Sequence, residues 1–401
     1  MPGPTVSHGH GDTSAVDADA VVARRVRILL AAVLTPLLLL TLVGVVMLWP
    51  SHEVKVDALQ TAKARGVVLS IAPCAERPDE CDRARVKVTA GEGTGSEVDA
   101  RVVKHPLVPR VQAGNRILMQ VIPEAAADER YKYVDQDRGR PLLLLVGIFA
   151  AAVIALSRWR GLAALGALAV TAVVLTQFVM PAILAGGDPL LVAVVGAFVI
   201  MSVTLLLTHG PNAQTAISMA GTAGALVLTA ALGELFVLGS RISGLDNNGA
   251  SEVAAYVPGG VNLPSLVVAG LVIGALGVLD DVTVTQTAAV WELSAAKPNA
   301  SRRELLAAGL RIGRSHVASV VNTLVLAYAG AALPLLMLFA ITGTPDSYVV
   351  SLETVATQIV NGLVGSLGII AAVPLTTALA AAAVAHRSGS VPSPRDAVDA
   401  G

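Results

Sequence analysis

Long apolar runs without charge recur along the chain and are separated by short polar segments. A helix needs about 20 apolar residues to cross the hydrocarbon core of a bilayer, with a lower limit of roughly 17. Most of the runs reach that length, so they predict an all-α membrane protein. A first helix stands alone, and a bundle of seven helices occupies 141–385. The predicted spans are 24–49, 141–157, 161–184, 190–208, 213–238, 264–296, 316–340 and 354–385.

The segment 50–140 has a different pattern, because apolar residues recur there at every second position. Val67 and Leu69, Val86 and Val88, and the series Ile117, Met119 and Val121 alternate with polar residues. Such short alternating runs, separated by turn residues, predict a small β-barrel or sandwich of about five strands. This domain is inserted between the first and second membrane helices.

The only two cysteines of the chain, Cys74 and Cys81, both lie in this segment. If the segment is translocated, its surroundings are oxidising, and a local disulfide is expected. The alternative is a pair of free thiols that bind a metal. We predict the disulfide and no metal site.

The distribution of cations predicts the orientation of the spans. Cytoplasmic loops of membrane proteins are enriched in Lys and Arg. With residues 1–23 and 386–401 as cytoplasmic tails, the short outer loops contain only Arg241. We therefore expect both termini in the cytoplasm and the β domain outside. The predicted inner segments contain Arg24, Arg25, Arg27, Arg158, Arg160, Lys297, Arg302, Arg303, Arg311, Arg314, Arg387 and Arg395.

The amino-acid composition and the absence of known motifs exclude several classes of protein. The chain is 54% apolar and 14% charged, with a mean hydropathy of +0.70, which excludes an ordinary soluble protein. No basic aromatic patch suggests a nucleic-acid partner. The sequence has no P-loop, no nucleophile-elbow serine motif and no zinc-protease helix motif, so we expect neither an enzyme nor a cofactor.

Two adjacent carboxylates, Asp280 and Asp281, follow the uncharged stretch 264–279 in the sixth span. Carboxylates at membrane depth are costly and usually face a protein interior or a water-filled cavity. The pair marks either the cytoplasmic exit of the span or an acidic site in an aqueous pocket. A catalytic dyad is disfavoured, because adjacent residues point about 100° apart around a helix. Arg311 and Arg314 are candidate ionic partners.

Within this pair, Asp281 is the preferred functional group, because Thr285 and Glu292 continue its helical face. Asp280 is then the supporting group, with Thr283 and Thr287 on its side.

Other polar side chains in the spans extend from the acidic pair as a possible ion path. The inner half holds Asp280, Asp281, Thr285, Gln286 and Asn322, the outer half holds Glu234, Gln358 and Asn361, and Tyr328 and Ser366 lie between. Such a row of polar side chains across the membrane favours a secondary transporter or permease for a small cation or proton. The alternative is a membrane scaffold or assembly partner that binds an envelope protein through its outer β domain.

Four stretches resemble the bacterial YibE/F-like membrane proteins. They are THGPNAQTAISMAGTAGAL (208–226), GVLDDVTVTQTAAVWEL (277–293), IGRSHVASVVNTLVLAYAGAALPLL (312–336) and GSLGIIAAVPLTT (365–377). The passage from the β domain into the second span, 131–151, also fits. Gln214 stands where family members often carry a cation, and Ser315 where they carry an acidic residue. The resemblance implies a membrane location and an extracytoplasmic N-terminal domain, and it implies no activity.

Overall fold

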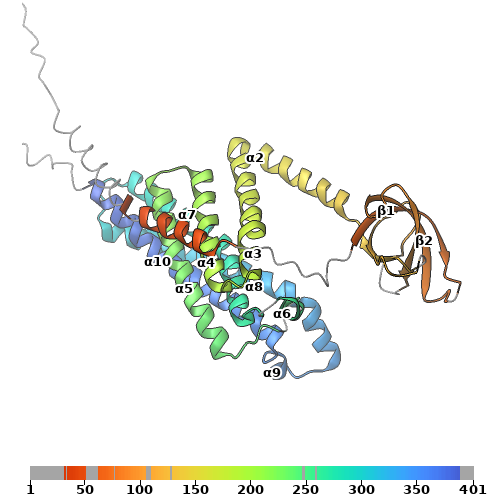
Figure 1. Cartoon of the computed structure of the whole chain (residues 1–401). Helices are drawn as coiled ribbons and strands as arrows, with labels where there is room; N and C mark the ends of the chain where they lie inside the picture. The colour runs from red at the N-terminus through yellow and green to blue at the C-terminus, as the bar shows by residue number, and fades with distance from the viewer. Residues whose placement is uncertain are drawn as a thin grey trace, which may run out of the picture. The chain divides into compact units, whose positions relative to one another are not determined.

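The computed structural model describes residues 31–32, 34–50, 62–75, 77–104, 110–126, 129–245, 249–257 and 260–388. The predicted tail at 1–23 and most of that at 386–401 lie outside these ranges. Contacts divide the chain into two units (Figure 1). One unit is Lys55–Leu162, and the other combines Met1–Val54 with Ala163–Gly401.

Five strands in the first unit form a closed barrel in the order β1-β2-β3-β5-β4. Neighbouring strands are antiparallel except for β3 and β5, which are parallel. This is the strand order of the OB-fold barrel. The predicted small barrel of about five strands is therefore confirmed. The strands are β1 (Ala62–Pro73), β2 (Cys81–Gly91), β3 (Glu97–Val103), β4 (Arg116–Val121) and β5 (Tyr131–Gln136).

The barrel core follows the predicted alternation on β2 and β4. Val86, Val88, Ile117, Met119 and Val121 are all buried. Strand β1 differs, because Val68 is buried while Leu69 is 43% exposed. Ala64, Gly66 and Val68 are buried at every second position, so the alternation on β1 is one residue out of step with the predicted series of Val67 and Leu69.

The end of the barrel is fixed by Asp137. The backbone N–H of Gly139 donates to its Oδ1 at 3.0 Å, and Arg116 Nε lies 3.4 Å from its Oδ2. The hydrogen bond from Gly139, followed by the Arg116 guanidinium, holds the pKa of the Asp137 carboxyl below its usual range. The carboxylate thus joins β4 to the first residue of helix α2.

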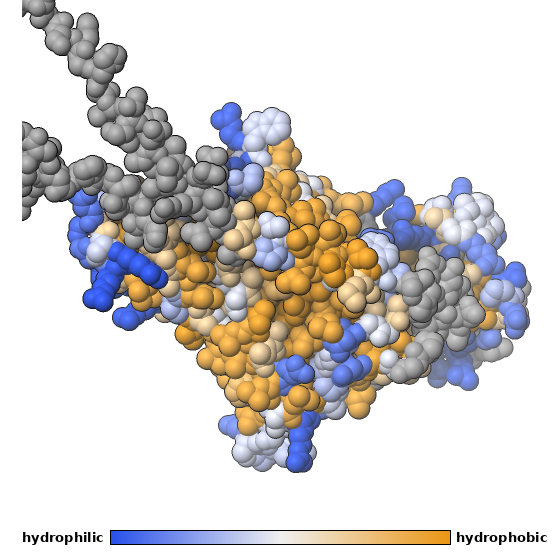
Figure 2. All heavy atoms as spheres, turned by 60° about the vertical axis from the view of Figure 1, so that its left-hand side comes forward, coloured by the Kyte–Doolittle hydropathy of each residue, from blue (hydrophilic) through white to orange (hydrophobic). Residues whose placement is uncertain are grey.

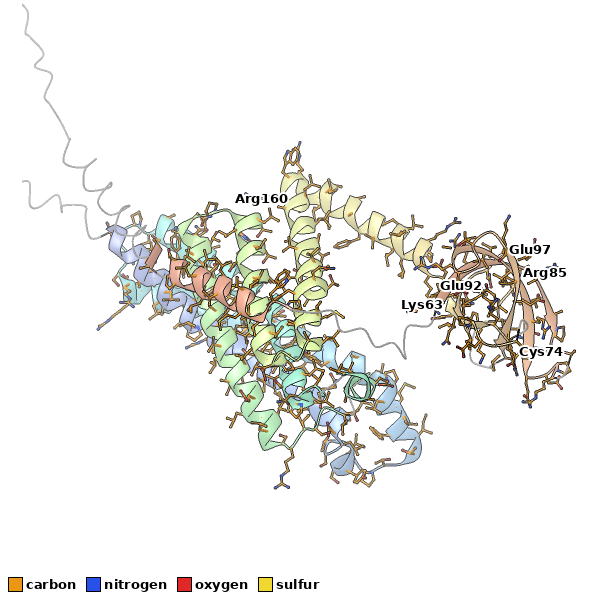
Figure 3. All side chains as sticks on the ribbon, in the orientation of Figure 1. Lys63, Cys74, Arg85, Glu92, Glu97 and Arg160 are labelled. Atoms are coloured by element: carbon orange, nitrogen blue, oxygen red, sulfur yellow. A yellow bond between two sulfur atoms is a disulfide. The ribbon has the colours of Figure 1, made fainter. Side chains whose placement is uncertain are left out.

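The predicted second and third spans form one long helical run with a break. It comprises α2 (Gly139–Val174), the π-helical turn η2 (Leu175–Val179) and α3 (Met180–Leu184). Arg158 has φ 51° and ψ −124°, so α2 consists of two helices that meet at a kink. The break falls in the predicted Arg158–Trp159–Arg160 boundary, beside the Arg160 labelled in Figure 3. The kink separates the two apolar segments that the sequence pattern distinguished.

Several further helices follow, and six helical runs in the described part of the chain are long and apolar enough to cross a membrane. A shorter apolar helix, Leu34–Leu48, lies in the predicted first span. The predicted seventh span, 316–340, belongs to a longer continuous helix, α8, which begins at Arg302. The remaining helices are α4 (Pro189–His209), α5 (Ala213–Gly239), α6 (Ala250–Tyr256), α7 (Leu263–Ala296), α8 (Arg302–Thr342), α9 (Asp346–Val349) and α10 (Glu353–Ser388).

Helix starts carry the capping residues that the sequence offers. Asp188, Asn212 and Asn262 each accept a backbone N–H at the first turn of α4, α5 and α7. Ser301 and Glu304 form a capping box at the start of α8. These caps satisfy backbone donors that a helix leaves without partners at its N-terminus.

The core of the helical unit lies where α4, α5, α7 and α10 meet. Met201, Met219, Leu226, Leu279 and Ile369 are fully or almost fully buried there. Many large apolar side chains remain on the outside, and they cover much of the face shown in Figure 2. Exposed apolar surface on this scale is expected of helices that lie against lipid rather than water.

Candidate functional site

Asp280 lies near the middle of α7, which continues without interruption from Leu263 to Ala296. At about 1.5 Å per residue, Asp280 is about 26 Å from the first residue of the helix and about 24 Å from the last. The acidic pair therefore does not mark the end of this helix. The 34 residues of α7 extend about 51 Å against roughly 30 Å of hydrocarbon, so a carboxylate near the middle lies inside the bilayer or at its boundary.

The two adjacent aspartates have different surroundings. Asp281 is exposed, as is Thr285 one turn further along the helix. Asp280 is half-buried, and its Oδ1 is buried without a hydrogen-bond partner among the described residues. Neither carboxylate forms an ion pair with Arg311 or Arg314 in that part of the chain. Burial thus distinguishes the two carboxylates and sets Asp280 apart, whereas the sequence pattern favoured Asp281 as the functional group.

A series of buried hydroxyls joins α5 to α7 beside Asp280. Thr222 and Thr283 share a hydrogen bond of 2.6 Å between their Oγ1 atoms, and Ser218 Oγ donates to Thr287 Oγ1 at 3.1 Å. Thr283 Oγ1 also donates to the backbone carbonyl of Asp280 at 3.0 Å. Hydroxyl hydrogen bonds of this kind connect helices where no water competes.

The predicted position of Thr283 and Thr287 on the Asp280 side of α7 agrees with this arrangement. The sequence analysis did not find Ser218 or Thr222 on α5. Their spacing of four residues matches that of Thr283 and Thr287, which is the signal that could have revealed the pairing.

Gln286 connects three helices and is buried. Its Nε2 donates to the Gly309 carbonyl on α8 at 2.8 Å and to Thr377 Oγ1 on α10 at 2.7 Å. A Cβ on Gly309 would lie 2.7 Å from Thr377 Cγ2, so only glycine lets α8 approach so closely. Both amide hydrogens of Gln286 are thus used to hold the bundle together, which gives this predicted site residue a structural function.

The other predicted polar residues are spread over several places. Asn322 and Glu234 are exposed, and Gln358 is half-buried. Glu234 borders a small cleft of about 90 Å³ with Asp188 and Ser265, at the ends of other helices. These side chains do not form the continuous row of polar groups across the bundle that the sequence suggested.

Tyr328 lies between α7 and α10. Its hydroxyl is 3.3 Å from the position of a Cβ on Gly274, and its ring is 3.6 Å from that on Gly362. Nearby on α10, Ser366 donates to the Gly362 carbonyl at 2.6 Å, while Oδ1 of half-buried Asn361 has no partner among the described residues. Tyr328 therefore packs at glycine positions on both α7 and α10.

Buried polar atoms without a partner in the described part of the chain are unusual and require a cause. Six side-chain atoms in that part of the chain have this property, and the one carboxylate oxygen among them belongs to Asp280. Of the six residues, the sequence pattern had singled out only Asp280 and Asn361. The full group is Ser202 Oγ, Thr215 Oγ1, Asp280 Oδ1, His316 Nε2, Asn361 Oδ1 and Thr376 Oγ1.

Cys74 and Cys81 form the predicted disulfide, with Cα atoms 5.5 Å apart. Since both sulfur atoms are bonded, the alternative of two metal-binding thiols is excluded. Among the described residues, no group of three or more His, Cys, Asp or Glu side chains could hold a metal ion.

Comparison with known proteins bears on the helical unit. The family model described as YibE/F-like protein matches residues 145–386, which include every helix from α4 to α9 and most of α2 and α10. No curated protein and no solved structure matches the chain. The match covers more than half of the sequence and includes both Asp280 and the hydroxyls that pack beside it. The chain belongs to the YibE/F-like family.

Proposed function

We propose that this chain is a permease that moves protons or small cations across the bacterial inner membrane, with Asp280 as the ion-binding group. The observation that carries the proposal is the buried, unpartnered Oδ1 of Asp280 near the middle of α7. A carboxyl group buried inside a membrane bundle is stable only if a bound cation neutralises its charge or a proton converts it to the neutral acid.

The surroundings of Asp280 suit reversible binding of a proton or a small cation. Thr283 and Thr287 lie three and seven residues further along α7, on the same side of the helix. Their hydroxyls, with those of Ser218 and Thr222, supply oxygen atoms at the α5–α7 contact. Oxygen ligands suit hard cations, and hydroxyls also conduct protons between carboxylates and water.

The proposed topology has eight spans, with both termini in the cytoplasm and the β-barrel outside. The clustering of Lys and Arg in alternate loops supports it, because cytoplasmic loops carry the excess of cations. The Cys74–Cys81 disulfide supports an oxidising location for the barrel. The kink at Arg158, which carries two cations and a tryptophan, suits an inner turn between the second and third spans.

The test is ion flux through the purified chain in proteoliposomes. A potassium diffusion potential drives uptake, and dyes inside the vesicles report protons and sodium in parallel. We expect flux above that of empty vesicles, and we expect Asp280→Asn to reduce it at least about tenfold, because the ion loses its charged ligand.

Asp281→Asn is the matched control, since it makes the same chemical change one residue away on an exposed position. It should retain most of the flux. If Asp280→Asn conducts as well as the unaltered chain, or if no tested cation exceeds the empty-vesicle rate, the proposal is wrong. Thermal melting in detergent confirms that each variant is folded.

A second candidate function is that of a scaffold or assembly partner which acts through the barrel. The observation that favours it is an arginine-lined cleft on the barrel wall. In that case both aspartate variants would preserve function in cells, while changes in the barrel would abolish it.

A further inference from the structure

A cleft of about 360 Å³ lies on the outer wall of the β-barrel. The cleft is lined by residues of β1, β2 and β3 and by the β1–β2 loop that contains the disulfide. Glu129, in the loop between β4 and β5, also lines it. Barrels with this strand order commonly bind oligonucleotides or oligosaccharides at this position. The charged side chains that line it are Arg77, Arg83, Arg85, Asp99, Arg101 and Glu129.

We propose that this cleft is a binding site for an acidic oligosaccharide, whose carboxylate or phosphate groups are held by the arginines. The proposal goes beyond the permease function, and only the extracytoplasmic location of the barrel is shared with it. The two proposals can fail separately, because one is tested by flux and the other by binding.

The register of the strands brings like charges together in the cleft floor. Arg83 on β2 pairs directly with Arg101 on β3, whereas Arg85 pairs with Asp99. Cations directly opposite each other on neighbouring strands are destabilising. An anionic group bound between Arg83 and Arg101 would be attracted by both guanidinium groups, which favours a ligand with negative charge.

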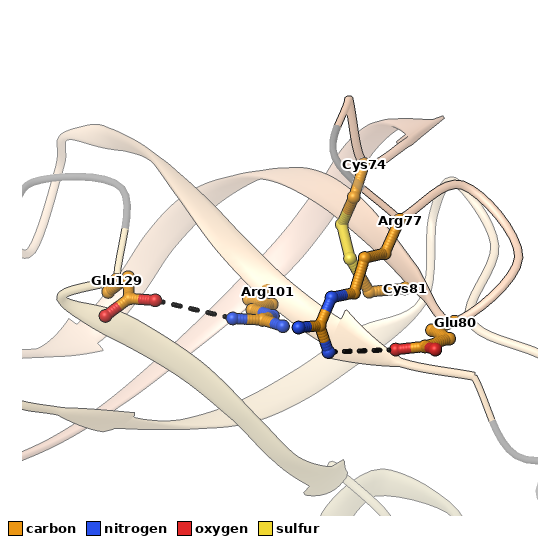
Figure 4. A network of polar contacts seen from close by, with 6 residues as sticks. All are labelled: Cys74, Arg77, Glu80, Cys81, Arg101 and Glu129. Carbon is orange, nitrogen blue, oxygen red and sulfur yellow. Dashed lines mark hydrogen bonds and ion pairs between the residues drawn. A yellow bond between two sulfur atoms is a disulfide. The ribbon is translucent and has the colours of Figure 1, made fainter.

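The guanidinium groups of Arg77 and Arg101 form only exposed ion pairs, which a ligand can replace. Arg101 lies 3.4 Å from Glu129, and Arg77 lies 3.2 Å from Glu80 (Figure 4). The four side chains are 39–68% exposed, and ion pairs so accessible to water contribute little. Figure 4 also shows the guanidinium group of Arg77 directed toward that of Arg101. Planar guanidinium groups bind carboxylates and phosphates through two parallel hydrogen bonds.

The disulfide fixes the loop that carries Arg77. Cys74 N–H donates to the Cys81 carbonyl at 3.1 Å, and Cys81 N–H donates to the Arg77 carbonyl at 3.1 Å. Together with the disulfide, these bonds limit the conformations open to the loop. A loop that is ordered before binding loses less conformational entropy when a ligand arrives.

The side chains in the cleft favour a sugar over other anions. Asp99 and Glu129 are acceptors that suit the hydroxyls of a sugar and would repel a uniformly anionic backbone. None of the described residues that line the cleft is aromatic, so bases would find no stacking surface. The barrel is closed, so an extended peptide would find no free strand edge to join.

The test measures binding to the full chain in neutral detergent micelles by isothermal titration. Trigalacturonate supplies carboxylates, maltotriose phosphate supplies phosphate, and maltotriose is the uncharged comparison. We expect at least one acidic sugar to bind, more weakly at high salt, and maltotriose not to bind. Arg83→Gln and Arg101→Gln should each weaken binding by about tenfold or more, as loss of a charge-assisted hydrogen bond predicts.

Lys87→Gln is the matched control, because Lys87 is exposed on the same strand, faces outward like Arg83, and does not line the cleft. It should change affinity by no more than about twofold. Thermal melting of each variant separates a loss of binding from a loss of folding. The proposal is overturned if neither acidic sugar binds, or if maltotriose binds equally well. It is also overturned if Lys87→Gln is as harmful as Arg83→Gln, or if hexaglutamate or oligothymidylate binds more tightly than both acidic sugars.

Discussion

Replacing Gln286 by Leu removes the amide that joins α7 to α8 and α10. Two hydrogen bonds are lost, to the Gly309 carbonyl and to Thr377 Oγ1. Between membrane helices such bonds average about 0.6 kcal/mol each and reach at most about 1.7 kcal/mol. Thr377 Oγ1 keeps its own bond to the Val373 carbonyl at 2.6 Å, so this acceptor is not left without a partner. We therefore expect a loss of about 1.2 kcal/mol in the free energy of unfolding, with an upper bound of about 3.4 kcal/mol.

The assay is equilibrium unfolding in mixed micelles, followed by tryptophan fluorescence. Trp291 is a suitable reporter, because it lies near Gln286 on α7 and packs against a cluster that includes Val290 and Leu305. Phe replaces Trp49 and Trp159 so that the signal comes from this position alone. The fluorescence change then follows the separation of α7 from α8 and α10.

Gln358→Leu is the matched control, because Gln358 is half-buried on α10 and has no hydrogen bond among the described residues. It should change the unfolding free energy by less than about 0.5 kcal/mol. Equal stability of the two variants would show that the Gln286 amide does not hold the helices together. A loss well above the upper bound would mean that its side chain has a packing role that the two hydrogen bonds do not explain.

Three further predictions concern packing, topology and pH. Gly368→Ala should destabilise the bundle by roughly 1–3 kcal/mol in the same unfolding assay, because a Cβ there would overlap the Thr229 hydroxyl. An unchanged free energy of unfolding would contradict the close contact between Gly368 and Thr229. A cysteine reporter at Gly95 should react with a membrane-impermeant thiol reagent in intact cells while one at Ser301 should not, and the reverse labelling would overturn the topology. Because its carboxyl pKa is lowered on folding, Asp137 should stabilise the barrel above the ordinary aspartate value of 3.8 and lose that effect as the pH falls below it. The melting temperature of Asp137→Asn should therefore approach that of the unaltered chain in acid, and a constant difference at every pH would refute the assignment.

The sequence alone was sufficient for features that depend on local pattern. Apolar runs of bilayer length located the helices, because hydrocarbon thickness fixes the number of residues that a span needs. Alternation located the strands of the barrel, and the disulfide was expected from two cysteines within one segment that was predicted to be translocated. The break at Arg158 was marked by cations beside a tryptophan, which are residues typical of an interface.

The tertiary structure decided which side of each element faces the interior. Helix α7 is apolar on most of its circumference, so its sequence contains no amphipathic pattern that distinguishes Asp280 from Asp281. Only packing against α5 shows that Asp280 lies on the side of the buried hydroxyls and that Asp281 is exposed. On β1, Val68 lies inside the barrel and Leu69 outside, because pairing with both β2 and β4 decides which face of the strand turns inward. Likewise, Arg83 and Arg101 come together only because β2 and β3 pair in one register, which neither strand encodes by itself.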